Sequence, residues 1–332
     1  MEQELFEKYT KTYGKRFTRK QKHKFAKALH EDMTQAGYEK TMIKGSKLII
    51  MKAEDYFYGN RKRMKTVIVV PYDTPERKFW HKVFYFPLDG TKTMNKTLIA
   101  TYVPIILLYV FILAGLYIGG NFLSAPTMAN LMSFLMFVLV IFLIYLMVHG
   151  IGNRHNVNRN SSAVAAAVAL AKSLDKDERQ RIAFLFTDKN KGSFLGARCA
   201  DEDFVKDGKN PNVICLDCIG KGDTTMIGYN PSNRKLAMEI AKCYPEKGKQ
   251  IETIKLDESM RVQTAMSYFR KAVVIASGTL DEDHRLYVMG TGTSKDRDAD
   301  ATQITNCLLY TSYCYFRFVF HILIRISSGK IL

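Results

Sequence analysis

Residues 157–174 read VNRNSSAVAAAVALAKSL, a polar turn that runs directly into an alanine-rich stretch. Alanine has the highest helix propensity and serine is one of the residue types that begin helices, so the stretch predicts a turn followed by a helix over 162–174. The turn has the polar spacing of a metal-binding loop, yet it contains no carboxylate. The sequence therefore raises the question of whether this loop holds a metal.

Strand and helix patterns alternate on both sides of this segment. Further helices are predicted at 17–36, from apolar residues at helical spacing, and at 234–243. Short apolar runs predict strands at 47–51, 66–70, 181–187, 213–216 and 272–276. Such alternation is typical of an α/β fold, so we expect a mixed sheet sandwiched by helices.

Two apolar segments, 98–120 and 128–148, interrupt this alternation. Neither contains a charged residue, and each has the roughly 20 residues needed to cross a bilayer. The linker between them is uncharged, whereas cationic residues flank the outer ends of the pair: Lys92, Lys96, Arg154 and Arg159. Because positively charged flanks stay on the cytoplasmic side, we expect a transmembrane helical hairpin whose two ends both face the cytoplasm.

This pattern divides the chain into four parts. Residues 1–95 and 151–306 are expected to form one α/β domain, and residues 96–150 the hairpin inserted into it. From Cys307 onward the sequence becomes aromatic, and CLLYTS resembles the translation of a transposon end used in sequencing libraries. Residues 307–332 are therefore expected to be a non-native tail. A third membrane segment is the alternative, which Arg317 and Arg325 disfavour.

The formal charge of +17 suits either nucleic acid or anionic lipid, because both attract spread lysines. The uncharged segments favour the membrane, and no nucleic-acid-binding motif accompanies the charge. The first thirty residues lack the apolar core of a signal peptide. We expect an integral protein of the inner or plasma membrane, with both termini and the α/β domain cytoplasmic. Its cysteines should be reduced there, and Cys215 and Cys218 should be buried by packing rather than bind zinc.

The order and spacing of three segments indicate a relationship to a known family. The segments are 158–171 (NRNSSAVAAAVALA), 182–197 (IAFLFTDKNKGSFLGA) and 213–223 (VICLDCIGKGD). All three resemble segments of the M28 family of zinc aminopeptidases. The first resembles the family's Asp-x-Asn-x-Ser-Gly turn and the helix after it, and the second resembles its strand with a Glu-Glu pair and a Leu-Gly-Ser turn. The third resembles its Leu-Asp-Met-Ile-Gly strand. The resemblance spans about residues 15–306. It implies an α/β sandwich that holds two cocatalytic metals at the carboxyl ends of its strands.

Most positions that the resemblance assigns to metal binding carry other residues in this chain. The histidine of the family's His-x-Asp is Pro71, and the bridging aspartate is Asn158. The glutamates that act as general base and ligand are Asn190 and Lys191, and the late histidine falls near Gly292. Two divalent ions require bridging carboxylates and imidazoles, so the resemblance implies a degraded site with no catalytic residue and no zinc cofactor.

Asp217 alone matches a ligand position, and Asp73 matches a supporting one. Four other residues could replace the lost ligands, namely His149, His155, Asp188 and His284. His155 is the best placed of them, because it lies in the loop before Asn158. The acidic run at 281–283 is most simply a solvated turn. The basic turn at 61–65 is by default a solvated loop, and contact with anionic lipid headgroups is the alternative.

These observations support three interpretations of function. The first is a membrane-anchored, non-catalytic binding or scaffolding module, whose loop kept its shape because the shape positions the helix and strands. The second is an active zinc-dependent aminopeptidase with atypical ligands. The third is a protein that binds a peptide or small molecule in the cleft at the strand ends without chemistry. The expected partners are the lipid bilayer, its anionic headgroups and an unidentified protein or peptide, but no nucleic acid.

Overall fold

A computed structural model describes residues 3–48, 51–78, 84–122, 126–190, 194–243, 250–300 and 304. Within these residues the strands form one mixed sheet in the order β1-β2-β5-β3-β6-β9-β10-β4, with β7 paired to both β8 and β9. The strands are β1 (Lys40–Leu48), β2 (Met51–Tyr58), β3 (Thr66–Pro71), β4 (Phe84–Tyr85), β5 (Ile182–Thr187), β6 (Asn212–Leu216), β7 (Thr224–Tyr229), β8 (Gln250–Lys255), β9 (Ala272–Leu280) and β10 (Leu286–Met289).

The centre of the sheet consists of the parallel strands β5, β3, β6 and β9. Ile68 of β3 lies opposite both Phe184 of β5 and Ile214 of β6. Every residue of β3 and β5 is buried, which explains why these strands are apolar without alternation. Because the strands are parallel, the loops that follow them all leave from the same edge of the sheet.

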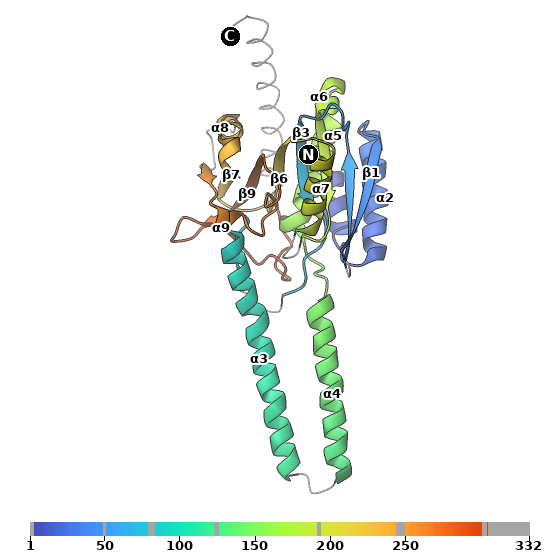
Figure 1. The fold of residues 1–332 in the computed structure, drawn as a ribbon, viewed down its shortest axis with the longest axis vertical. Helices are drawn as coiled ribbons and strands as arrows, with labels where there is room; N and C mark the ends of the chain where they lie inside the picture. The colour runs from blue at the N-terminus through green and yellow to red at the C-terminus, as the bar shows by residue number, and fades with distance from the viewer. Residues whose placement is uncertain are drawn as a thin grey trace, which may run out of the picture.

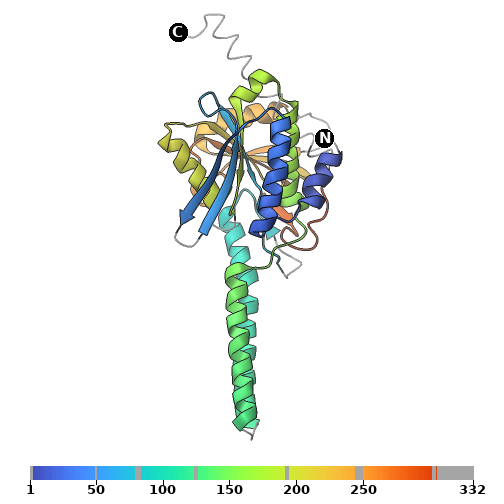
Figure 2. The same cartoon turned by 90° about the vertical axis from the view of Figure 1, so that its right-hand side faces the viewer.

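Helices cover both faces of the sheet (Figures 1 and 2). One core cluster lies under the elements α1 (Gln3–Glu7), η1 (Lys8–Thr12), α2 (Arg19–Gln35), α5 (Ser162–Ser173) and α8 (Arg234–Cys243). The other lies under α7 (Leu195–Lys206) and α9 (Glu258–Arg261). The remaining short helices are η2 (Val157–Ser161), α6 (Lys176–Arg181) and η3 (Pro231–Asn233). The expected mixed sheet with helices on both faces is confirmed.

The helix α2 illustrates how the local sequence sets these elements. Thr18 caps its first turn, and Gln21 returns a hydrogen bond to the backbone of Thr18, which completes a capping box. Phe25, Leu29 and Met33 lie on its buried face, as the helical spacing predicted. The helix ends just before a glycine at position 37 with a φ of +80°, a conformation that suits glycine.

One strand prediction was wrong in its boundaries, and several strands were missed. The predicted strand at 47–51 covers the end of β1 and the start of β2, which pair as antiparallel neighbours, and residues 49 and 50 lie outside the described residues. An apolar run cannot reveal a chain reversal when no turn residue interrupts it. The strands β4, β7, β8 and β10 were not predicted, because they are very short or contain many polar residues.

Two long helices, α3 (Gly90–Phe122) and α4 (Pro126–His149), project together from one side of the domain (Figures 1 and 2). Their apolar side chains are exposed, for example Phe111 at 73% and Tyr117 at 75%. Within the described part of the chain, the segment Gly90–Tyr117 is long and apolar enough to cross a membrane, and α4 contains a shorter apolar stretch, Asn130–Tyr145. α3 begins before residue 96, where the inserted segment was expected to start. The expected tail at 307–332 lies outside the described residues.

Candidate functional site

The candidate site lies at the carboxyl ends of the parallel strands, where open α/β sheets bind their ligands. Asp73 follows β3, Asn190 follows β5 and Asp217 follows β6, while Asn158 lies in η2 before α5. All four side chains are buried. The structure therefore brings these four sequence-predicted positions to one edge of the sheet, as the resemblance implied.

The carboxylate of Asp73 is held by amide groups. The Asn190 side-chain Nδ2 donates to Asp73 Oδ1 at 2.7 Å, and the Asn190 backbone N–H donates to Oδ2 at 3.2 Å. Asn160 Nδ2 donates to the backbone carbonyl of Asp73. Asn190, at the position where the resemblance places a general base, thus donates hydrogen bonds to a neighbouring carboxylate, which an ionised glutamate side chain could not do.

Asn158 connects two loops of the site. Its Oδ1 accepts from the Gly220 N–H at 2.9 Å, and its own N–H donates to Asp296 Oδ1 at 2.7 Å. A β-carbon on Gly220 would lie 2.7 Å from Ala299 and 3.0 Å from Asn158 Oδ1, so the approach requires glycine. Asn158 therefore links this loop to the segment after β6 and to the segment that contains Asp296.

Asp217 lies beside a tyrosine and an arginine. The Tyr85 hydroxyl donates to Asp217 Oδ2 at 2.5 Å, and the Arg159 guanidinium carbon lies 4.1 Å from the centre of the Tyr85 ring. Asp217 Oδ1 is buried and has no hydrogen-bond partner among the described residues. Burial raises the pKa of Asp217, while Arg159 and the Tyr85 hydrogen bond oppose that rise.

Sequence reasoning missed the role of Arg159. Burial disfavours its charged form, but the neighbouring Tyr85 and Asp217 outweigh this effect, and the pKa of Arg159 lies above its ordinary value. The guanidinium therefore stays positively charged where it stacks on Tyr85, whose hydroxyl donates to Asp217. The one available signal was its position directly after Asn158, where the resemblance places a bridging ligand.

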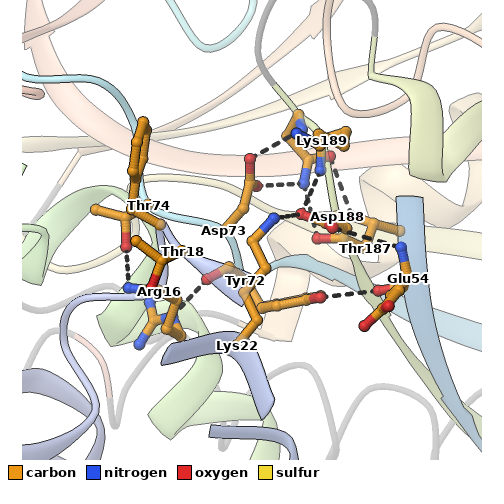
Figure 3. A network of polar contacts seen from close by, with 12 residues as sticks. Arg16, Thr18, Lys22, Glu54, Tyr72, Asp73, Thr74, Thr187, Asp188 and Lys189 are labelled. Atoms are coloured by element: carbon orange, nitrogen blue, oxygen red, sulfur yellow. Dashed lines mark hydrogen bonds and ion pairs between the residues drawn. The ribbon is translucent and has the colours of Figure 1, made fainter. Parts of the chain in front are cut away.

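A second cation, Lys22, is paired with Asp188, which lies near Asp73 (Figure 3). Lys22 reaches from α2 to form a buried ion pair with Asp188 Oδ1, which also accepts the Lys189 N–H at 2.7 Å. Burial raises the pKa of Asp188, Asp73 adds to that rise, and Lys22 opposes it. Asp188, considered as a replacement ligand, is thus already paired with a charge of the protein itself.

The remaining predicted ligand positions supply no ligand among the described residues. Pro71 ends β3 opposite Thr187 and has no donor atom in its side chain. Gly292 lies in a turn with a φ of +77°, and its carbonyl accepts the Lys78 N–H at 2.7 Å. Lys191 lies outside the described residues.

Among the described residues, His155 and His284 belong to no group of potential metal ligands. His155 is half-buried; burial lowers its pKa, and Arg297, Arg154 and Arg77 lower it further. His284 is exposed in the turn between β9 and β10, and the side chain of His149 is outside the described residues. Across the described ranges, no group of three or more His, Cys, Asp or Glu side chains could hold a metal ion.

The other predicted features lie outside this site. Cys215 and Cys218 are both fully buried free thiols in separate core clusters, as expected for packing residues. The acidic run forms a turn in which Glu282 is exposed, but Asp281 and Asp283 bond to Lys92 of α3 at 2.7 and 3.0 Å. A cavity of about 210 Å³ lies at the amino ends of β6 and β9, lined among others by Phe204, Val213 and Phe269.

A pH-dependent stability is expected from Asp296, whose buried carboxyl accepts the Asn158 N–H. Burial raises its pKa to about 6, against about 3.9 in an unfolded chain. The folded state therefore binds this proton more tightly, and the stabilisation present below about pH 4 is lost as the pH rises through about 6, a change of about 3 kcal/mol.

Melting curves between pH 4 and 7 check this expectation. The unmodified protein should lose free energy of unfolding between pH 4 and 7 as Asp296 ionises, and the variant Asp296→Asn should not. The variant should therefore gain in stability relative to the unmodified protein as the pH rises. Asp298→Asn, at a neighbouring exposed position, is the matched control and should follow the unmodified protein. Parallel curves for all three proteins would contradict the assignment.

Comparison with known proteins places this geometry in a fold group. No protein-family model matches the sequence. No curated protein matches it either. Solved structures do match. A glutaminyl cyclase of Porphyromonas gingivalis is 11% identical with a TM-score of 0.60, and the match covers 95% of this chain and 96% of that one. A Zn-dependent exopeptidase of Parabacteroides distasonis is 10% identical with a TM-score of 0.55, and the match covers 92% of this chain and 94% of that one. The LapA aminopeptidase of Legionella pneumophila matches at 9% identity with a TM-score of 0.51, covering 92% and 68%. The chain has a zinc aminopeptidase-like fold.

Proposed function

We propose that this protein is a membrane-anchored, non-catalytic form of the aminopeptidase-like fold that serves as a binding or scaffolding module. The observation that carries the proposal is the position of the chain's own cations. The Arg159 guanidinium stacks on Tyr85, whose hydroxyl donates to Asp217, and Lys22 pairs with Asp188. Positive charge that a metal would supply in an enzyme of this fold is supplied here by side chains.

The groups at the strand ends do not fit a pair of zinc ions. Zinc in proteins is bound by thiolate, imidazole or carboxylate, and a catalytic pair needs a bridging anion. The bridging position is Asn158, whose amide oxygen already accepts the Gly220 N–H. A fixed guanidinium beside Asp217 would also repel a divalent ion, at a cost that grows in a buried site.

The runner-up is an active zinc-dependent aminopeptidase with atypical ligands, and one observation favours it. Asp217 Oδ1 is buried without a hydrogen-bond partner within the described part of the chain, as a metal ligand would be if the metal were left out. The relatives in fold also include a glutaminyl cyclase and exopeptidases. A cyclase of N-terminal glutaminyl peptides is therefore a second activity worth assaying.

Activity assays separate these two functions. The full-length protein, purified with zinc present, should hydrolyse no amino-acid anilide and cyclise no N-terminal glutaminyl peptide above a chelator-treated sample. The variant Arg159→Met removes the fixed cation and should still be inactive, because Asn158 and Asn190 remain. Turnover in the unmodified protein that a chelator abolishes and zinc restores would establish the enzyme and refute the non-catalytic proposal.

Membrane anchoring rests on α3 and α4, whose exposed apolar side chains need a non-aqueous environment. The base of α3 stays attached to the domain through Thr91, whose hydroxyl donates to the Ser259 carbonyl at 2.5 Å, and through the Lys92 ion pairs. We place the domain and both termini in the cytoplasm, at an inner or plasma membrane, because cations flank both outer ends of the helix pair.

A deletion tests the anchor. Replacing residues 96–149 with a short flexible linker should yield a soluble, folded domain, since the contacts of Thr91 and Lys92 are retained, whereas the full chain should need detergent or lipid. Protease protection of the full chain in vesicles should leave residues 3–95 and 155–300 equally accessible from one side. Digestion of these two parts from opposite sides would contradict the hairpin topology.

A further inference from the structure

Three segments of the chain meet where α3 and α4 join the domain. Segments 75–78, 150–157 and 290–297 are fixed to one another by backbone bonds and one side-chain bond. The Glu76–Gly152 bridge consists of Arg77 N–H to the Ile151 carbonyl (2.6 Å) and Asn153 N–H to the Pro75 carbonyl (3.1 Å). Lys78 N–H to the Gly292 carbonyl (2.7 Å) and Asn153 Nδ2 to the Thr293 carbonyl (3.0 Å) join the third segment. Side chains on these segments therefore keep a fixed arrangement.

Each of the three segments carries one arginine: Arg77 follows the Glu76–Gly152 bridge, Arg154 lies two residues after Gly152, and Arg297 Nε donates to the Ser294 carbonyl at 2.7 Å. All three lower the pKa of His155. All three arginines are exposed, and none of them forms a salt bridge with a carboxylate in the part of the chain that the structure describes. Asp296, the residue before Arg297, is buried and bonded to the Asn158 backbone instead. The junction also contains the carboxyl of Glu76, which lies against Gly150, so three arginines share one carboxylate there. Like charges in excess raise the local potential, which an anion can offset.

The three arginines lie where both apolar helices begin to leave the domain. Lys78, next to Arg77, donates to the Thr97 hydroxyl of α3 at 3.3 Å, and the exposed apolar side chains of α3 begin at the following residue, Leu98. On the other helix, Ile151 follows the end of α4 and is bonded to the Arg77 backbone. In a bilayer spanned by α3 and α4, this level is the headgroup region.

We propose that Arg77, Arg154 and Arg297 form a binding site for the phosphate group of an anionic lipid, at the surface of the membrane that α3 and α4 span. The inference rests on the proposed membrane anchoring and adds the lipid class that the anchored domain binds. Arginine suits this ligand because its planar guanidinium binds phosphate oxygens in pairs. A zwitterionic headgroup, whose choline carries a compensating positive charge, gains less from three cations.

The structure locates this site away from the basic turn that the sequence first suggested for headgroup contact. That turn lies at the amino end of β3, whereas α3 and α4 join the domain beyond the carboxyl end of β3 (Figure 1). Arg61 of the turn is paired with Asp203 and with Asp207, the latter at 3.0 Å. Its neighbours Lys62, Arg63 and Lys65 are exposed, which makes them a charge-matched control.

Lipid enrichment around the full-length protein tests the site. The protein is reconstituted into vesicles of equimolar phosphatidylcholine and phosphatidylglycerol, excised in polymer-bounded discs, and the lipid ratio of the discs is compared with that of protein-free discs. We expect phosphatidylglycerol to be enriched about twofold by the unmodified protein. The enrichment should disappear in Arg77→Gln/Arg154→Gln/Arg297→Gln and persist in Lys62→Gln/Arg63→Gln/Lys65→Gln, which loses the same charge.

The outcomes distinguish this proposal from the anchoring on which it rests. If the unmodified protein does not float with these vesicles, the anchoring is wrong and the lipid site is wrong with it. If the protein floats but enriches no phosphatidylglycerol, or if both triple variants lose enrichment equally, only the lipid site is wrong. Inorganic phosphate is titrated in detergent as a further arm, following the His155 imidazole signals. A shift with phosphate in a protein that enriches no lipid would identify free phosphate as the ligand and overturn the proposal.

Discussion

Replacing Arg16 with methionine is expected to destabilise the domain by about 3 to 5 kcal/mol, enough to unfold much of it at 37 °C. Arg16 is fully buried, and its guanidinium donates to the Tyr72 carbonyl, to the Tyr13 carbonyl at 2.7 Å and to Ser161 Oγ at 3.0 Å. It also lies 5.0 Å above the Phe25 ring. Methionine would leave these buried acceptors without donors, because it fills the space but cannot donate.

The expected loss is measured by thermal unfolding of the purified full-length protein in detergent. Burial lowers the pKa of Arg16 to about 10, so the side chain remains charged at neutral pH and the result should not depend on pH between 6 and 8. Arg19→Met, at an exposed position of the same segment, is the matched control and should change stability by less than about 0.5 kcal/mol. Equal melting temperatures for Arg16→Met and the unmodified protein would contradict this account of how the N-terminal segment is held.

Replacing Lys22 with methionine has the second largest expected effect, a loss of about 3 kcal/mol at pH 8. The substitution leaves Asp188 buried beside Asp73 without its ion-pair partner (Figure 3). With Lys22 gone, the pKa of Asp188 rises further, because the interaction that opposed the rise has been removed. A carboxyl with a raised pKa in the folded state stabilises that state at low pH, so the loss should be smaller at pH 5 than at pH 8.

The double variant Lys22→Met/Asp188→Asn separates loss of the ion pair from loss of packing. Removing both charges should recover most of the stability that the single variant loses at pH 8, since no unpaired charge then remains buried. Lys20→Met, exposed on the same helix, is the control for the change in net charge. If the double variant were as unstable as the single one at both pH values, the Lys22 side chain would act through packing and not through Asp188.

The local part of this structure could be predicted from the sequence. The helix α5 and the strands β3, β5, β6 and β9 lie within a few residues of the expected bounds, because each is buried on a face that the apolar pattern defines. The positions of Asp73, Asn158, Asn190 and Asp217 at one sheet edge followed from the resemblance, since parallel strands end together. Short or polar strands such as β4 and β8 escaped prediction because their pairing partners, and not their own sequences, make them strands.

The charge partners within the site could not be predicted. Lys22 and Asp188 are separated by 166 positions, and Arg16 and Ser161 by 145, so no local pattern connects them. Arg159 was considered only as a charge flanking the apolar segments, and its stacking on Tyr85 depends on how β4 pairs with β10. The sequence therefore predicted which ligand positions carry other residues, whereas the structure was needed to find the cations near the remaining carboxylates.

The zinc content of the purified full-length protein tests the central claim most directly. After purification with zinc present and removal of loosely bound metal, elemental analysis should find well under about one zinc ion per chain, because one matched carboxylate cannot hold a divalent ion beside a guanidinium. The variant Asn158→Asp/Asn190→Glu/Lys191→Glu/Arg159→Met, which restores three anionic positions and removes the cation, should bind more zinc than the unmodified protein if the cleft keeps the geometry of the fold. About two tightly bound zinc ions per chain in the unmodified protein would contradict the account and identify a working metal centre.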